Sequence, residues 1–217
     1  MACGMACRMT WPFDDATRRN IAERCAAFAR RSDGEPAPAL KRAAVAIALT
    51  ADSATSETTL LLTRRAAGLR AHRAQWALPG GRCDAGETHI ETALRELHEE
   101  LGLGLKPDAV LGMLDDYPTR SGYLVTPVVV WAADGGAISP NPQEVASVHQ
   151  ASLAAIEPAE AFDFVTIPES PRRVIRFHFE GRLIHAPTAA MIYQFREVLA
   201  GRATRVADLE QPVFAWK

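Results

Sequence analysis

The clearest hydrophobic periodicity in the chain runs through residues 88–102. Four apolar side chains recur there at spacings of four, three and four residues: Ile90, Leu94, Leu97 and Leu101. This spacing predicts one buried stripe on an amphipathic helix. Thr88 and Glu91 have the spacing of a capping box, so the helix is expected to begin near Thr88. Gly102 is suited to end it in the left-handed conformation.

The remaining pattern predicts alternating strands and helices. A narrow apolar stripe of Ile21, Cys25 and Phe28 predicts an amphipathic helix over residues 15–31, with Asp14 or Asp15 as its cap. Pro187 is expected at the first position of a closing helix. Apolar runs between turn residues predict strands, and they cover residues 43–50, 58–63, 110–116, 123–132, 174–179 and 182–185.

Composition places this pattern in one α/β domain. The 217 residues are 48% hydrophobic with a formal net charge of −2, which describes an ordinary globular chain and provides no basic face for nucleic acid. The apolar runs are too short to span a membrane. We expect an N-terminal extension with a helix and a linker over residues 1–40, the main domain over 41–200, and a C-terminal tail over 201–217 anchored by Phe214 and Trp216.

The four cysteines do not have the spacing of a disulfide framework, so a reducing, cytoplasmic location is expected. Cys3 and Cys7 have no second ligand pair nearby for a shared metal. Cys83 lies in the loop before the acidic helix, where we interpret it as incidental. His89 and His98 are expected to be exposed helix residues. The sequence leaves the oligomeric state open, and a homodimer is compatible with it.

Three carboxylates share the polar side of the predicted helix. Glu96, Glu99 and Glu100 lie three, four and one residues apart, where like charges repel. A hard cation such as Mg²⁺ would turn this repulsion into attraction, whereas the alternative is a solvated acidic face. Gly80 and Gly81 precede the helix and allow the backbone to approach a ligand closely, which favours the cation.

Nine residues at fixed spacing then match the Nudix box: Gly81, Glu87, Arg95, Glu96, Leu97, Glu99, Glu100, Gly102 and Leu103. The chain therefore resembles the Nudix hydrolases, enzymes that cleave a nucleoside diphosphate linked to another group. The resemblance implies a Nudix-type mixed sheet sandwiched between helices. It also implies that the three glutamates bind Mg²⁺ or Mn²⁺, that the Gly80 carbonyl is a further ligand, and that Glu87 orients Arg95.

Basic residues crowd the segment before the box. Arg64, Arg65, Arg70 and Arg73 are suited to hold phosphates, although a solvated loop paired with surface acids is the alternative. Part of this segment resembles the coenzyme A pyrophosphatases of the Nudix group, through Leu61, Leu62, Thr63, Arg65, Ala66, Arg70, Pro79, Gly80 and Gly81. Two positions depart from that motif, with Ala74 in place of glycine and Leu78 in place of phenylalanine.

The resemblance also points to a glutamate across the cleft from the box helix. In many Nudix enzymes a glutamate at about this place binds metal or activates water, and Glu144 is the candidate here. The alternative is a surface acid that starts a helix behind Pro142.

The predicted reaction is metal-dependent hydrolysis of a pyrophosphate bond in a small nucleotide substrate. The resemblance to the coenzyme A pyrophosphatases implies coenzyme A or its thioesters as substrate, which would yield 3′,5′-ADP and phosphopantetheine or its acyl form. ADP-ribose or a dinucleotide is the alternative substrate. A non-catalytic ligand-binding module is the alternative of another class, but such modules usually have eroded box carboxylates, which are intact here. An RNA-decapping enzyme would need a basic face for its substrate, and this chain has none.

Overall fold

The computed structural model describes residues 10–31, 40–66 and 75–215. Its centre is a mixed sheet in which β1 and β7 run parallel and the other pairs are antiparallel. β2 pairs with β8 on one side, and on the other side with the end of β1 and then with β3. β4 pairs antiparallel with the first half of β1. The strands are β1 (Lys41–Ala51), β2 (Thr58–Arg65), β3 (Trp76–Ala77), β4 (Gly80–Arg82), β5 (Val110–Met113), β6 (Tyr117–Pro118), β7 (Tyr123–Trp131) and β8 (Val145–Ser152).

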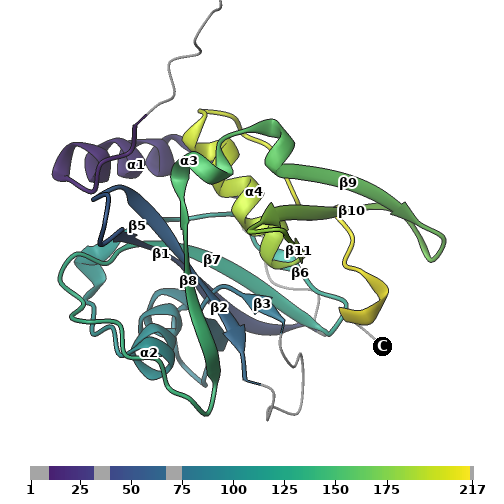
Figure 1. Cartoon of the computed structure of the whole chain (residues 1–217). Coiled ribbons are helices and arrows are strands. Elements are labelled where there is room, and N and C mark those ends of the chain that lie inside the picture. Colours follow the sequence, from purple (N-terminus) through teal and green to yellow (C-terminus); the bar gives the residue numbers. More distant parts are fainter. Residues whose placement is uncertain (1–9, 32–39, 67–74, 216–217) are drawn as a thin grey trace, which may run out of the picture.

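Helices cover both faces of this sheet. In Figure 1, α2 (His89–Leu101) lies below the sheet, and α1 (Asp15–Ala27) and α4 (Thr188–Leu199) lie above it. A short helix, α3 (Leu153–Ile156), follows β8, and single 3₁₀ turns span Pro107–Ala109, Ala159–Ala161 and Val213–Ala215. The predicted α/β sandwich is therefore confirmed. Among the described residues, no helix is long and apolar enough to cross a membrane.

Alternation along β1 explains the two layers. Ile47 and Leu49 pack in the core on the α1 and α4 side, whereas Ala44, Ala46 and Ala48 pack on the α2 side. Neighbouring residues of a strand point to opposite faces. Small alanines on one face let α2 lie close to the sheet, which brings its side chains near β4.

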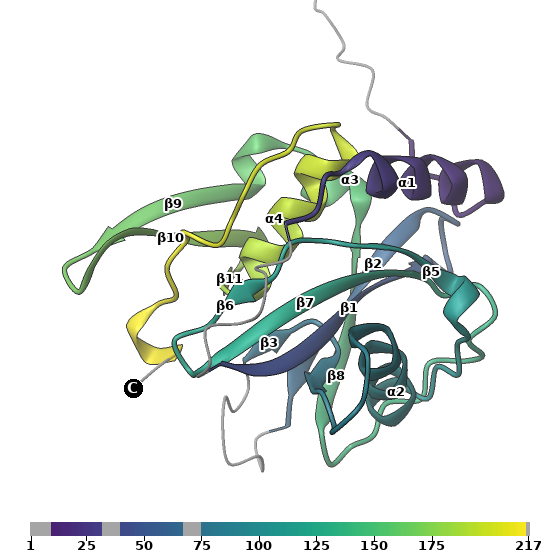
Figure 2. The same cartoon turned by 180° about the vertical axis from the view of Figure 1, so that it is seen from behind.

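A second, three-stranded antiparallel sheet lies beside α4, as Figure 2 shows from behind. It contains β9 (Phe162–Ile167), β10 (Ser170–Phe179) and β11 (Arg182–His185). The predicted hairpin of β10 and β11 is confirmed, whereas β8 and β9 were not predicted. Pro187 lies at the N-cap of α4, one position before the predicted one.

The N-terminal helix begins as predicted but ends early. Asp14 is its N-cap and accepts a hydrogen bond from the Thr17 amide at 2.8 Å. The stripe residues Ile21, Cys25 and Phe28 are buried, as expected. The helix ends at Ala27 instead of residue 31, and the predicted linker at 32–38 lies outside the described residues.

Much of the C-terminal segment is packed against the domain. The Tyr117 hydroxyl donates to the Leu209 carbonyl at 2.8 Å, and the Glu210 carboxylate, 2% exposed, accepts from Arg120 and from Ser170. Phe214 is 59% exposed and therefore does not anchor the segment in the core. The expectation of a tail held by Phe214 was wrong, because hydrogen bonds at Leu209 and Glu210 hold it. Trp216 lies outside the described residues, and the domain division stays a prediction.

Candidate active site

The helix α2 is oriented by its caps and its apolar stripe. The Thr88 hydroxyl accepts from the Glu91 amide, and the Glu91 carboxylate accepts from the Thr88 amide, so the predicted capping box is present. Gly102 ends the helix with φ of 72°. Leu94, Leu97 and Leu101 are buried. Because this stripe faces the sheet, Glu96 and Glu100 lie on the side of α2 next to β4, at Gly81 and Gly80.

Gly81 fits against one of the predicted metal ligands. A Cβ at this position would stand 2.2 Å from Oε1 of Glu96. Gly81 pairs with Ala44 of β1, which fixes its backbone beside α2. A glycine is therefore required where the Glu96 carboxylate lies, which gives a physical reason for the first glycine of the box.

Arg95 connects three of the carboxylates. Its Nε donates to Glu87 Oε1 at 2.8 Å and its Nη2 donates to Glu87 Oε2 at 3.1 Å. Its Nη1 donates to Glu96 at 3.0 Å and to Glu99 at 2.8 Å. The hydrogen bonds from Arg95, followed by one from the Asp84 amide, lower the pKa of Glu87 to about 2. The predicted contact between Glu87 and Arg95 is present, and it keeps Glu87 ionised.

Glu100 is the most buried carboxylate of the site, at 4% exposed. Burial raises its pKa to about 8. Arg65 and a hydrogen bond from the Gly80 amide favour the ionised form, whereas the nearby Glu96 and Glu144 disfavour it. Burial likewise raises the pKa of Glu96, although Arg95 partly offsets this effect. For both Glu100 and Glu96, the cost of burial therefore outweighs the stabilisation that the nearby arginines give to the ionised carboxylate.

The loop before β8 brings Glu144 to this cluster. The Ser139 and Asn141 amides donate to the carbonyls of Leu101 and Glu100, at 2.8 and 2.9 Å. These bonds satisfy carbonyls at the C-terminal end of α2 that have no partner within the helix. Glu144 itself is half-buried, lies in a turn and precedes a strand. It does not start a helix, so that alternative was wrong.

Two of the predicted phosphate contacts lie at the end of β2. Arg65 faces the α2 side near Glu100, and its Nε is buried without a hydrogen-bond partner among the described residues. Arg64 points to the other face, with its guanidinium 5.8 Å from the centre of the Trp76 ring. The structure therefore separates these two arginines. Arg70 and Arg73, like Ala74, lie outside the described residues.

The donor chemistry of the cluster fits a hard divalent cation. Its carboxylates and the Gly80 carbonyl are oxygen ligands of the kind that Mg²⁺ and Mn²⁺ take. Within the part of the chain that is described, no three His, Cys, Asp or Glu side chains converge into a metal-binding group. Glu96 and Glu99 instead contact Arg95, which supplies positive charge to them.

Sequence reasoning missed one contact and misplaced one histidine. Thr92 is fully buried, and its hydroxyl donates to Glu87 at 3.0 Å, so it helps to fix the partner of Arg95. Its position three residues before Arg95, on the same helix face, was the available signal. His98 is exposed as predicted, whereas His89 is half-buried against the Arg42 guanidinium, at 3.1 Å.

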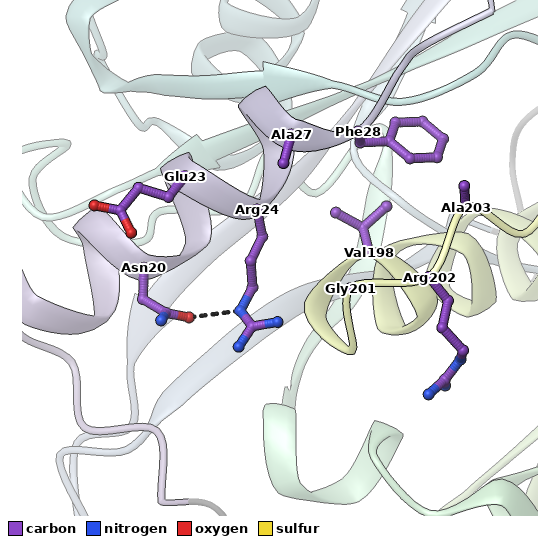
Figure 3. Close-up of a pocket in the computed structure, with 9 residues that line it drawn as sticks. All are labelled: Asn20, Glu23, Arg24, Ala27, Phe28, Val198, Gly201, Arg202 and Ala203. Carbon is purple, nitrogen blue, oxygen red and sulfur yellow. Dashed lines mark hydrogen bonds between the residues drawn. The ribbon is translucent and has the colours of Figure 1, made fainter.

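A cavity of about 350 Å³ lies between α1 and the C-terminal end of α4, away from the carboxylates. Figure 3 shows its lining, in which Arg24 is held by Asn20 and lies across from Arg202. Arg202 is bonded to Glu197. The cavity carries none of the predicted site residues, so it is separate from the candidate active site.

Comparisons with known proteins agree with this geometry. Residues 40–170 match the model of the NUDIX domain. The chain is 36% identical over 142 residues to an uncharacterized Nudix hydrolase NudL of Photorhabdus laumondii, covering 64% of this chain and 76% of that protein. It is 37% identical over 139 residues to the Yersinia enterocolitica NudL, covering 63% and 71%.

A solved structure shares the fold. The MutT/nudix family protein from Enterococcus faecalis has a TM-score of 0.52 at 17% identity, covering 86% of this chain and 75% of that one. The matched domain model includes the box, its helix and the strands that place them. The chain thus belongs to the Nudix hydrolases, enzymes that hydrolyse pyrophosphate bonds in nucleotide derivatives and generally need divalent metal ions.

Proposed function

We propose that this enzyme hydrolyses coenzyme A or its thioesters to 3′,5′-ADP and phosphopantetheine or its acyl form. The observation that carries the proposal is the segment from Leu61 to Gly81, which resembles the coenzyme A pyrophosphatases. Leu78, which departs from that motif, is 4% exposed and keeps the buried apolar character of the position. The position of Arg65, beside the carboxylates, supports a role in holding a substrate phosphate.

We assign the metal to Glu96, Glu99, Glu100 and the Gly80 carbonyl. When bound, a divalent cation neutralises charge on phosphate oxygens and makes a water molecule more acidic. Arg95 holds Glu96 and Glu99, and Glu87 holds Arg95. Glu144, near Glu96 and Glu100, is assigned to metal binding or to accepting a proton from the attacking water. Arg65 and Arg70 are assigned to substrate phosphates.

The test is a substrate panel with Mg²⁺ and with Mn²⁺. Coenzyme A, acetyl-coenzyme A, ADP-ribose and NADH are compared by kcat/KM, and the products are identified by mass. Formation of 3′,5′-ADP from coenzyme A at the highest kcat/KM supports the proposal. Turnover of ADP-ribose or NADH without turnover of coenzyme A contradicts it and favours the alternative substrates.

Two arginine variants distinguish phosphate binding by Arg65 from a general effect of removing positive charge. Arg65→Ala is expected to raise KM for coenzyme A and to lower kcat, because its guanidinium lies beside the carboxylates. The matched control is Arg82→Ala, which removes an exposed arginine of β4 whose carbonyl, not its side chain, accepts from Arg95. Equal effects of the two variants would contradict the assignment of Arg65.

A further inference from the structure

The Glu87 carboxylate is held from two elements at once. Glu87 lies in the loop after β4, immediately before the Thr88 N-cap of α2. Its Oε2 accepts from the Asp84 amide of the same loop at 2.9 Å and from the Thr92 hydroxyl of α2 at 3.0 Å. Arg95, about one turn further along α2, donates to both carboxylate oxygens. The loop that carries Glu87 is therefore tied to the helix that carries the predicted metal ligands.

The Thr92 hydroxyl has two acceptors within reach but only one proton. The second acceptor is the Thr88 carbonyl at 3.1 Å, in the preceding turn of the helix. That carbonyl already accepts from the Thr92 amide at 3.0 Å, whereas the ionised Glu87 carboxylate is the stronger acceptor. The hydroxyl proton therefore goes to Glu87. Thr92 is 0% exposed, so bulk solvent does not compete for this hydrogen bond.

This hydrogen bond acts on the predicted metal ligands through Arg95. Glu87 accepts from Nε and Nη2 of the guanidinium, and this two-point contact fixes the plane of the group. The remaining nitrogen, Nη1, donates to Oε1 of Glu96 at 3.0 Å and to Oε2 of Glu99 at 2.8 Å. One oxygen of each glutamate is thus held by a group whose orientation depends on Glu87. A displaced Glu87 would turn the guanidinium, and both carboxylates would follow it.

We propose that Thr92 is a positioning residue for the divalent cation and acts through Glu87 and Arg95 on the metal-binding glutamates. This inference rests on the metal assignment of the proposed function and deepens it. Loss of a partner that orients metal ligands typically weakens metal binding by about 10–100-fold. Thr92 supplies one of four hydrogen bonds to the Glu87 side chain within the described part of the chain. We therefore expect an effect of about tenfold, the lower end of that range.

Two substitutions separate the hydroxyl of Thr92 from its methyl group. Thr92→Val keeps the shape of the buried side chain and removes the proton donor, whereas Thr92→Ser keeps the donor and removes the methyl group. Binding of Mn²⁺ to the full chain is measured by electron paramagnetic resonance, without substrate. Thr92→Val is expected to bind Mn²⁺ about tenfold more weakly, and Thr92→Ser as tightly as the wild type. Thr92→Ser should instead lower Tm, because it leaves a cavity.

Thr59→Val is the matched control for the loss of a buried hydroxyl group. Thr59 is 2% exposed and donates to the Thr50 carbonyl at 3.1 Å. It lies at the opposite end of β2 from Arg65. The substitution removes a hydrogen bond of the same kind as in Thr92→Val, but it is expected to leave the affinity for Mn²⁺ unchanged.

Wild-type affinity for Mn²⁺ in Thr92→Val would overturn the proposal, as would equal weakening in Thr92→Ser or in Thr59→Val. A wild-type protein that binds no Mn²⁺ would overturn it together with the metal assignment. If the wild type and Thr92→Val bind Mn²⁺ equally and coenzyme A is hydrolysed, the inference fails and the proposed function stands. If Thr92→Val binds Mn²⁺ more weakly but coenzyme A is not hydrolysed, the substrate assignment fails and the role of Thr92 stands.

Discussion

Gly81 lies so close to Glu96 that a Cβ on the glycine would stand 2.2 Å from the carboxylate oxygen Oε1. The clashing atoms are at the end of a flexible side chain, which can turn away. At Gly80, one residue earlier, a Cβ would instead stand 2.4 Å from the Ala44 carbonyl oxygen and 2.6 Å from the Val45 Cα. Two adjacent glycines are therefore required for different reasons.

Gly81→Ala is expected to displace Glu96 and to lower kcat about 100-fold, with little change in melting temperature. Gly80→Ala is expected to cost about 3 kcal/mol of unfolding free energy, a fall in Tm of about 6–12 °C, because backbone atoms must move. Calorimetry and a kcat measurement on both variants check this contrast. A Gly81→Ala protein with the activity of the wild type would remove Glu96 from the site.

Two glutamates of α2 have separate tasks. The Glu99 side chain is 50% exposed and accepts a hydrogen bond from Arg95 at 2.8 Å. Glu99→Gln is therefore expected to lower kcat about 100-fold and to preserve the fold. Glu91→Gln, the same change in the capping box, keeps a capping side chain and is expected to leave kcat and Tm unchanged. Undiminished hydrolysis in Glu99→Gln would contradict the metal assignment.

Glu100 predicts a loss of stability with rising pH when no divalent cation is present. Its pKa is 4.5 in the reference state and about 8 in the fold. The native state therefore holds a proton that the unfolded state has released, and stability falls as pH rises from about 4.5 to about 8. Added Mg²⁺ favours the ionised form and is expected to reverse the loss.

Denaturant unfolding at pH 5 and pH 9, with EDTA or with Mg²⁺, measures this effect. Glu100→Gln is the comparison, and it is expected to show neither the pH dependence nor the Mg²⁺ response. A wild-type protein equally stable at both pH values in EDTA would mean that Glu100 is ionised throughout.

Glu210 is expected to have the opposite effect on stability: the protein loses stability as the pH is lowered. Hydrogen bonds from Arg120, opposed by burial and aided by Ser170, lower its pKa to about 2. The stabilisation of the fold by the ionised Glu210 carboxylate is complete above about pH 4.5, which is the pKa of this group in the reference state. It is lost as the pH falls toward 2. Glu210→Gln is expected to cost about 2 kcal/mol at pH 7, and its difference from the wild type should vanish near pH 2. Urea unfolding across this pH range provides the measurement.

Two cysteines are expected to differ in reactivity. Cys25 is 5% exposed, and burial raises its pKa to about 12, so little of it is thiolate at pH 8. Cys83 is half-buried in the box loop. Iodoacetamide on the native protein should label Cys83 and spare Cys25, as peptide mass mapping would show. Labelling of both in guanidinium is the control, and equal rates in the native protein would contradict the buried position of Cys25.

The box helix was predictable because its signals are local. The capping box, the apolar stripe and the C-cap of α2 each depend on residues within a few positions of one another. The strands β8 and β9 were missed because their burial comes from partners far along the chain. In β8, Val148 and His149 pair with Thr63 and Leu62, and no short-range pattern marks that pairing.

The sequence by itself determined the carboxylates, their spacing on one helix side and the glycines before them, because helical periodicity and box spacing are written in consecutive residues. Only the tertiary structure decided that Glu144 lies near Glu100, because the loop before β8 caps the end of α2. It likewise decided that Arg64 and Arg65 face opposite sides of the sheet. It also decided that Glu210 fastens the C-terminal segment. These relationships arise from strand pairing and burial between distant segments, which determine the environment and the pKa of each side chain.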